Sequence, residues 1–239
     1  PLFCFLSGSI YFCEANSIYL TNKNNTMKVK KLSGKVQDAR QIPTLFDNEN
    51  ITYHPIDIVN WKEYPYQPQV SFRIAYTNDA ILVHYKVVED SVRAKYGDDN
   101  GSVWTDSCVE FFSIPAGDGI YYNLECNCIA TILLAAGSER NNREMAPSEI
   151  TDQVKRWASL GRETFEEKLG ECTWEVALLI PYNVFFKHAI TGLDGMSIRA
   201  NFYKCGDELQ KPHFLSWNPI KIEKPDFHRP DFFGLLEFE

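Results

Sequence analysis

The sequence has 239 residues and a formal net charge of −8, from 24 basic and 32 acidic side chains. Its longest basic run is KVKK, Lys28 to Lys31, so nucleic acid and anionic membrane surfaces are poor candidate partners and a neutral polar ligand fits better. The length suits one all-β domain or two small ones. The 14% aromatic content, with 12 prolines and 13 glycines, is typical of a turn-rich β protein.

The first 26 residues differ from the rest of the sequence. They are apolar, but they contain no initiating Met and no basic region, and their longest apolar stretch is too short to span a bilayer. A truncated signal peptide would imply a secreted or periplasmic protein, whereas a start at Met27 would imply a cytoplasmic one; the KVKK that begins at Lys28 favours the latter. We expect an extension over residues 1–26 and a single domain over residues 27–239.

Cysteine spacing indicates no covalent or metal framework. The chain has seven cysteines, an odd count, and no CxxC pair. Cys126 and Cys128 lie two apart in an expected strand, where they are best interpreted as small buried hydrophobic residues.

Alternation with a period of two dominates from residue 70 onward. In the segment Val70 to Tyr76 the apolar side chains fall on one side, and the same holds from Ile81 to Val87. The turn signal Thr77-Asn-Asp79 separates the two runs, which predicts a β-hairpin. His84 falls on the polar side of the second run, so we expect it at the surface.

Two further strands carry polar residues on one face. In VWTDSCVEFF, Val103 to Phe112, neither side is cleanly apolar, so this is no ordinary half-buried strand. In YYNLECNC, the side chains alternate sharply between an expected inward set and an expected outward set. The inward set is Tyr122, Leu124, Cys126 and Cys128, and the outward set is Asn123, Glu125 and Asn127.

Further strands are expected at Trp174 to Pro181, in IRANFYKC, in HFLSW and in the terminal FGLLEFE. The stretch 148–161 has helical spacing after Ser148 but could equally contain a strand, and residues 181–190 suggest a short helix. Many strands joined by turns predict an all-β, antiparallel sandwich of the immunoglobulin-like or jelly-roll type with one or two short helices.

Catalytic motifs are scarce. The sequence has no GxSxG and no HExxH. The carboxylates of Asp106 and Glu110 could serve a glycoside hydrolase, and this enzyme class is kept as an alternative to binding.

A mixture of aromatic rings and planar polar groups supports sugar binding better. Aromatic faces pack against sugar C–H groups, while amide, carboxylate and guanidinium groups satisfy hydroxyls. The main candidates come from several expected strands and from the loop HFLSWNP: Trp104, Glu110, Arg199, Asn201, His213, Trp217 and Asn218. The outward set of Asn123, Glu125 and Asn127 is a further polar face of this mixture, and His228, beside an aromatic loop, could also touch a ligand.

These segments resemble a known family. WTDSCVEFF is similar to the W-x-D-D-S-V-E-x-F segment of family 9 carbohydrate-binding modules, and Trp174 to Pro181 resembles their W-x-x-E-x-x-I-P strand. RANFYKC, SWNPI and FHRPDFFGLLEF follow in the same order as the closing motifs of that family. The resemblance covers roughly residues 45 to 239, and the order of the loose motifs is what makes it specific.

The resemblance implies a β-sandwich of the dopamine-monooxygenase N-terminal-like type that binds a mono- or oligosaccharide without catalysis, in association with polysaccharide breakdown, for example beside a xylanase. It implies that Trp104 and Trp217 clamp a terminal sugar, with Glu110 as a hydroxyl acceptor and Arg199 and Asn201 nearby. Ala177 stands where the strand glutamate is expected, Lys204 replaces an arginine, and Cys108 interrupts the acidic run. A sandwich that has lost its sugar therefore stays open as a structural or interaction module.

Strand geometry limits how the first tryptophan could act. Six extended residues span about 20 Å, too far for one sugar to touch both Trp104 and Glu110, so Trp104 must lie on a loop folded back over the strand. The alternative is that Trp104 plugs one end of the sandwich while Glu110 pairs with Arg199.

Calcium is a separate expectation from the same resemblance. Asp98 and Asp99 are candidate ligands because oxygen donors are dense around them. They lack the spacing of a calcium loop, so a solvated acidic loop is the alternative interpretation.

Overall fold

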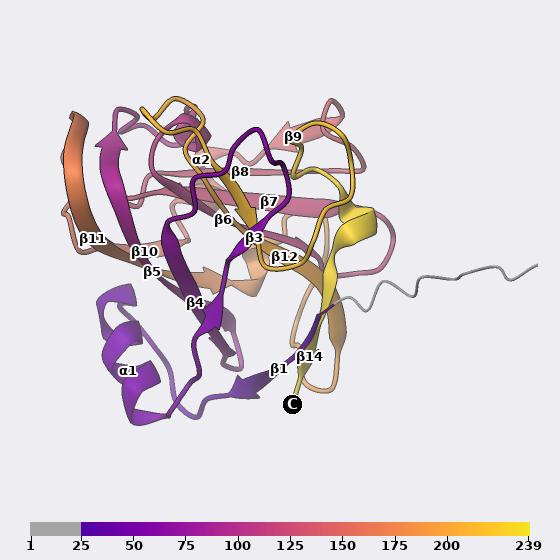
Figure 1. The fold of residues 1–239 in the computed structure, drawn as a ribbon. Coiled ribbons are helices and arrows are strands. Elements are labelled where there is room, and N and C mark those ends of the chain that lie inside the picture. The colour runs from indigo at the N-terminus through magenta and orange to yellow at the C-terminus, as the bar shows by residue number, and fades with distance from the viewer. Residues whose placement is uncertain (1–24) are drawn as a thin grey trace, which may run out of the picture.

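The computed structural model describes residues 25–239, which form two packed layers of β-strands (Figure 1). The expected extension over residues 1–26 lies outside the described residues except for Asn25 and Thr26. β1 (Thr26–Lys31) already begins at Thr26, and Asn25 donates its side-chain amide to the carbonyl of Trp217 at 2.8 Å. No helix of residues 25–239 has both the length and the apolar character needed to cross a bilayer.

The first layer contains four long or medium strands and one short one. Its order is β10 (Lys155–Ala158), β11 (Phe165–Pro181), β5 (Ala80–Ala94), β4 (Gln69–Tyr76), with β2 (His54–Pro55) paired to β4. All of these strands pair antiparallel.

The second layer carries the polar strands noted in the sequence. Its order is β14 (Gly234–Phe238), β12 (Ser197–Cys205), β6 (Cys108–Ile114), β7 (Tyr121–Asn127), β8 (Ile132–Gly137), β9 (Arg143–Met145). Two short strands, β13 (Phe214–Ser216) and β3 (Ile58–Val59), extend it beside β12. β1 pairs in parallel with both β14 and β4, so it joins the layers into one mixed sheet.

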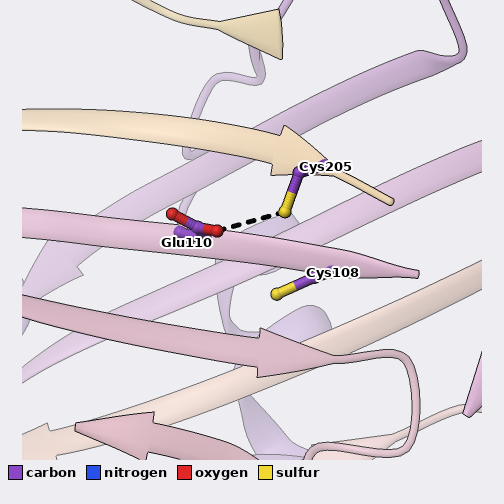
Figure 2. A group of neighbouring side chains, drawn as sticks. All are labelled: Cys108, Glu110 and Cys205. Atoms are coloured by element: carbon purple, nitrogen blue, oxygen red, sulfur yellow. Dashed lines mark hydrogen bonds between the residues drawn. The ribbon is translucent and has the colours of Figure 1, made fainter. Parts of the chain in front are cut away.

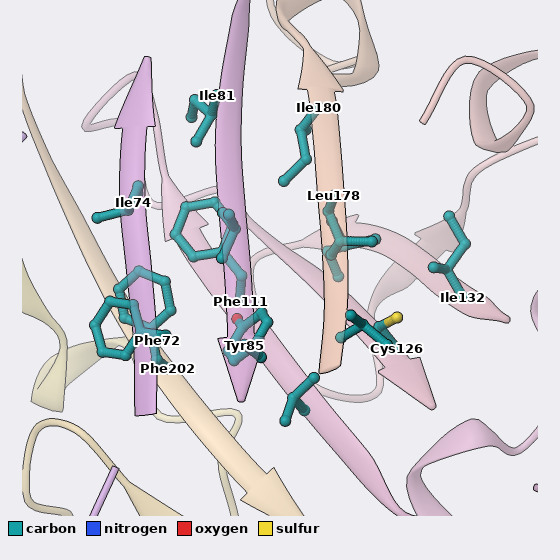
Figure 3. Close-up of a cluster of buried hydrophobic side chains, with 14 of the residues drawn as sticks. Phe72, Ile74, Ile81, Tyr85, Phe111, Cys126, Ile132, Leu178, Ile180 and Phe202 are labelled. Carbon is teal, nitrogen blue, oxygen red and sulfur yellow. The ribbon is translucent and has the colours of Figure 1, made fainter. Parts of the chain in front are cut away.

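The expected all-β sandwich is therefore confirmed, with parallel pairing at β1 as the departure from a purely antiparallel sheet. The main core lies between the layers, where Phe72 of β4 stacks on Phe202 of β12 with ring centroids 3.7 Å apart. Figure 3 shows this core, in which Tyr85 and Phe111 pack beside the stacked pair and Leu178 enters the same core from β11.

The hairpin of β4 and β5 forms as predicted, with Tyr76 opposite Ile81. Both apolar runs are buried in the core between the layers. The ambiguous segment contains both structures, because α2 (Ser148–Thr151) is followed by β10. The helix expected within residues 181–190 is only a 3₁₀ turn, Tyr182–Val184.

Helix α1 (Ile42–Asn48), which the sequence patterns do not predict, helps to cover the outer face of the first layer, where His84 lies. It is preceded by a 3₁₀ turn at Ala39–Gln41, and it packs on that face. The expectation that His84 lies at the surface is wrong, because its side chain is fully buried there. Arg73 contacts the imidazole Nδ1 at 2.9 Å and pairs with Asp47 of α1 at 2.6 Å.

The outer face of the second layer is also covered. Residues from the segment before β4 and from the segment between β13 and β14 form a second apolar cluster there, which includes Trp61, Phe214 and Phe227. β6 and β7 are therefore buried on both faces, so this is not a half-buried strand pair with one solvated face. Two acidic residues of the outer face, Glu110 and Glu125, are buried beside a cavity.

Candidate functional site

A cavity of about 250 Å³ lies between the outer face of β6, β7 and β12 and the segments that cover it. Its walls come from distant parts of the chain: the turn before β6, the β8–β9 hairpin, and the two loops after β12 and β13. The lining residues are Asn100, Trp104, Glu110, Glu125, Leu133, Arg140, Arg143, Met145, Cys205, Asp207, Phe214, Pro225, Asp226, Phe227 and His228.

Two glutamates form the floor of the cavity. Glu110 of β6 and Glu125 of β7 are directly opposed in the strand register and are only 3% and 4% exposed. Glu110 accepts a hydrogen bond from the Cys205 thiol through Oε1 at 3.1 Å, and Glu125 accepts one from Asn123 at 3.0 Å. The second carboxyl oxygen of each is buried with no partner among the described residues, so hydrogen-bonding capacity is left for a ligand.

Burial shapes the protonation of this floor. Desolvation, with the charge of Glu125 adding to it, raises the pKa of Glu110 well above its ordinary value. Desolvation also raises the pKa of Glu125 to about 7, although the Arg143 charge opposes this. Asp207, on the wall, has its pKa raised to about 6 by burial. The floor therefore keeps protons at a pH where exposed carboxyls have lost them, and it can both donate and accept hydrogen bonds.

Arginines balance these acids on one wall. Arg143 donates from Nε to the carbonyl of Arg140 at 2.8 Å, and Arg140 lies 3.6 Å from Asp226. The Nη1 group of Arg143 is buried without a hydrogen-bond partner in the described chain. Burial and these two positive charges lower the pKa of His228 to about 3, so its imidazole is neutral and meets the hydroxyl of Tyr121 at 2.9 Å.

Trp104 supplies a partly exposed aromatic surface to the cavity. It sits in the 3₁₀ turn Val103–Thr105 ahead of β6. Its carbonyl accepts a hydrogen bond from the backbone of Asp207 at 3.3 Å and lies 3.4 Å from the Cys205 sulfur. The turn folds back over the strand, so Trp104 and Glu110 line the same cavity. This is the arrangement that strand geometry required if both residues were to reach one ligand.

The structure does not bring Trp217 to this cavity. Its side chain is 6% exposed, and its indole meets Phe72 and Phe202 edge-on at 6.1 and 5.7 Å in the core between the layers. Its remaining surface faces a different hollow, near Met27 and His54. Trp217 has the parity of Leu215 on β13, which points inward, whereas Phe214 points outward and lines the cavity.

Asn201 and Asn218 hold the backbone of the covering loop. Asn201 donates to the carbonyl of Asn218 at 3.0 Å and accepts from its backbone N–H at 2.9 Å. Asn218 donates to the carbonyl of Phe232 and accepts from the backbone of Asn25 at 2.8 Å. Both amide side chains are buried. They do not line the cavity, but their hydrogen bonds hold the backbone of the loop that forms its wall.

The two remaining candidates also lie outside the cavity. His213 is fully buried, with Nε2 2.7 Å from the Lys204 ammonium and Nδ1 bonded to the carbonyl of Lys211 at 2.9 Å. Arg199 is exposed and donates to the carbonyl of Asp231 at 3.2 Å. It lies four residues along β12 from the position opposite Glu110, about 13 Å at the usual rise, so it does not pair with that glutamate.

The calcium candidates lie in the loop before β6. Asp99 pairs with Arg156 at 2.6 Å and accepts from the backbone of Ile132 at 3.1 Å, and Asp98 is exposed. Among residues 25–239, the group with three ligand atoms close enough for a metal ion is instead Cys108, Glu110 and Cys205. Calcium at Asp98 and Asp99 stays a prediction.

A partly exposed indole beside buried, incompletely bonded carboxyls in a cavity is the arrangement of a ligand-binding β-sandwich. The chain belongs to carbohydrate-binding family 9, whose model matches residues 40–238. This is a family of non-catalytic carbohydrate-binding modules, so the chain binds carbohydrate and is not an enzyme.

Three solved structures are similar to this chain. A candidate carbohydrate-binding protein from Bacteroides uniformis is 52% identical, with a TM-score of 0.89, and the match covers 90% of this chain and 100% of that one. A family 9 module from Caldicellulosiruptor kristjanssonii, solved with glucose, has a TM-score of 0.57 at 11% identity and covers 90% and 96%. Its cellotriose complex gives 0.57 at 12% identity, covering 90% and 94%. The comparison with curated proteins returned no match.

Two further residues noted in the sequence line the cavity. Glu125 belongs to the expected polar face with Asn123 and Asn127, and His228 is the loop histidine expected to be able to touch a ligand. The other aromatic and charged loop residues were not singled out, because they give no periodic signal and reach the cavity only through the folded path of the chain. These residues are Arg140, Arg143, Asp207, Phe214, Asp226 and Phe227.

Proposed function

We propose that the cavity binds one terminal sugar unit of a glycan, with Trp104 as the stacking surface and the Glu110–Glu125 floor as the hydrogen-bonding partner of its hydroxyls. The observation that carries the proposal is the pair of buried carboxyl oxygens that lack partners beside a partly exposed indole. Sugars present hydroxyls that both donate and accept, and apolar C–H faces that pack on aromatic rings.

The size of the cavity supports a single ring. Its volume of about 250 Å³ lies below the range of about 300 to 1,000 Å³ that is usual for pockets holding drug-sized ligands. A cavity of this size suits one sugar ring at the end of a chain better than a longer stretch of polymer. The second aromatic surface comes from Phe214 and Phe227, which line the same cavity, in place of Trp217.

The comparisons support the ligand class. The Bacteroides uniformis relative, which is 52% identical to this chain, is a candidate carbohydrate-binding protein. The two Caldicellulosiruptor complexes hold glucose and cellotriose. We therefore infer that a neutral hexose or a short β-linked glucan end is the first ligand to test. Association with polysaccharide breakdown, and with a xylanase in particular, stays a prediction.

The test is calorimetric titration of the full chain with glucose, cellotriose and a panel of other glycans, on wild type, Glu110→Gln and Trp104→Ala. We expect saturable binding that both substitutions weaken at least tenfold, while Arg199→Ala, on the exposed end of β12, leaves it unchanged. Binding that survives both cavity substitutions would place the sugar elsewhere and refute the proposal.

A further inference from the structure

Two thiols and one carboxylate meet at the floor of the cavity. Cys108 and Glu110 lie two residues apart on β6 and share its outer face, and Cys205 of β12 is the register partner of Cys108. One ligand atom from each of the three side chains lies within 4.8 Å of the other two, and all three residues are buried. Figure 2 shows them grouped on the two neighbouring strands, with the Cys205 sulfur directed at the Glu110 carboxylate.

The hydrogen bonds within this group leave its donor atoms available. The Cys205 thiol donates to Glu110 Oε1 at 3.1 Å, and Oε2 of Glu110 is buried without a partner in the described chain. Cys108 makes a long contact with the carbonyl of Val109, at 3.6 Å. An unpartnered buried carboxyl oxygen costs about 1–3 kcal/mol, so a cation placed here would relieve an unfavourable interaction already present.

The group is of the size that a four-coordinate metal requires. Zn–S bonds of about 2.3 Å and Zn–O bonds of about 2.0 Å set tetrahedral ligand atoms about 3.5 Å (S to O) and about 3.8 Å (S to S) apart. The 3.1 Å between the Cys205 sulfur and Glu110 Oε1 and the separations within 4.8 Å for the whole group bracket these values. Both of these residues line the cavity. An ion held by the three side chains would therefore keep one coordination position open to the cavity, and the cavity would be its entry path.

The charges around the group also permit a cation. Glu125 and Asp207 line the same cavity and can add negative charge to it. Arg140 and Arg143 also line it and carry positive charge, which partly offsets those acids. The two other cysteines of β7 and its turn, Cys126 and Cys128, point to the core between the layers, so they do not compete for an ion at the floor.

We propose that Cys108, Glu110 and Cys205 bind one thiophilic divalent cation, of the zinc and cadmium class, at the floor of the cavity. Two thiolates select soft or borderline metals over calcium and magnesium, which prefer oxygen ligands. Binding releases to the solvent the two thiol protons together with the proton that Glu110 holds, so that two thiolates and one carboxylate become the protein ligands. The inference is independent of the proposed function, because metal binding is measured with no glycan present.

The first test is titration of the reduced full chain with Cd²⁺, followed through the ultraviolet thiolate-to-cadmium charge-transfer absorption. We expect this band to saturate at one equivalent, and Cys108→Ser or Cys205→Ser to weaken the binding by more than about tenfold, since even loss of an outer-sphere partner costs that much at many sites. Glu110→Gln should weaken binding while leaving the thiolate band in place.

Matched cysteine controls separate this site from the other thiols. Cys172→Ser, on the outer part of β11, and the double substitution Cys4→Ser/Cys13→Ser should leave the Cd²⁺ titration unchanged. Absence of the band in the wild-type chain, or a band that both Cys108→Ser and Cys205→Ser leave intact, would overturn the proposal.

A second measurement does not depend on whether the serine variants fold. In the wild-type chain, Cys205 lines the cavity but is buried, and burial raises its thiol pKa well above the ordinary value, so its alkylation by iodoacetamide is slow. The exposure to iodoacetamide is therefore extended until mass spectrometry counts a measurable modification of Cys205 in the metal-free chain. We expect Zn²⁺ to slow the modification of Cys205 at least tenfold and that of Cys172 much less. Equal modification of Cys205 with and without Zn²⁺ contradicts the site.

Discussion

Glu110 and Glu125 lie directly opposite each other on neighbouring strands, and each keeps one buried carboxyl oxygen without a partner in the described chain. Two acidic side chains side by side in a covered face would normally be destabilising. The arrangement is tolerated because the pair holds protons to a higher pH than exposed glutamates do, and because a cavity adjoins it. A ligand in the cavity can supply the hydrogen-bond partners that these two carboxyl oxygens lack.

Replacing Glu110 by glutamine tests the floor directly. The amide keeps the shape but removes the carboxyl group that meets the ligand hydroxyls. Leaving a buried hydrogen-bonding group without its partner costs about 1–3 kcal/mol, and about 1.4 kcal/mol corresponds to a factor of ten. We therefore expect glycan affinity to fall roughly 10- to 100-fold by calorimetry, with Arg199→Ala as the variant that retains full affinity.

Removing the indole of Trp104 tests the stacking surface. Trp104→Ala should abolish measurable sugar binding while lowering the thermal unfolding midpoint little, because this side chain is partly exposed. The matched control is Trp157→Ala on β10, whose indole packs on the outer face of the first layer. Equal loss of binding in both variants would point to a general loss of structure instead of a role for Trp104.

Trp217 is expected to matter for folding and not for the ligand. Its indole fills the core against Phe72 and Phe202, so Trp217→Ala should cost about 3–5 kcal/mol of unfolding free energy, as large-to-small core changes do. Urea denaturation measures the loss, and calorimetry on the fraction that stays folded should return wild-type affinity. A Trp217→Ala variant that stays folded but no longer binds sugar would show that Trp217 contacts the ligand, which contradicts this prediction.

The protonation of Glu125 predicts a pH dependence of stability. Its pKa rises from 4.5 to about 7 on folding because it is buried. The folded chain then binds more protons than the unfolded chain between these values, so the contribution of Glu125 is fully present below 4.5 and is lost as the pH rises through 7.

Glu125→Gln removes this titration while its amide oxygen still accepts from Asn123. The free energy of unfolding, measured by urea titration across this pH range, should fall less with rising pH in the variant than in wild type. Two profiles that run parallel would show that Glu125 does not change its proton affinity on folding.

A buried ion pair on the other face of β12 gives a further prediction. Lys204 and Glu89 are both fully buried and 2.8 Å apart, and Glu89 also accepts from the indole of Trp174 at 2.6 Å. Lys204→Met would leave Glu89 as an unpaired buried charge, which costs about 3–5 kcal/mol. The double variant Lys204→Met/Glu89→Gln should recover much of that loss in urea denaturation, and a double variant as unstable as the single one would argue against the charge as the cause.

The strand pattern was predictable because each layer buries one continuous apolar face. Alternation with a period of two identified the β4–β5 hairpin and the inward residues of β7, and these features are confirmed. Helix α1 was not predicted, since it is a short amphipathic helix of about two turns that is stabilised by packing on the first layer. The burial of His84 follows from that packing and could not be foreseen either.

The site was predictable only in part. Trp104 and Glu110 were identified through their motif, and chain geometry required the turn that places them at one cavity. The expectation that Trp217 lies beside Trp104 came from the family resemblance. Trp217 follows directly after β13 and alternates in phase with Leu215, so both side chains point into the core between the layers.

The sequence by itself determined the layers of this protein, since alternation along a strand decides which side chains face a common core. Only the tertiary structure decided what happens on the other face of β6 and β7, because the loops that cover it are held by contacts between residues far apart in the chain. Cys108 and Cys205 show the difference most clearly: their spacing of nearly a hundred residues carries no metal-binding signal, and strand register alone brings their sulfur atoms to Glu110.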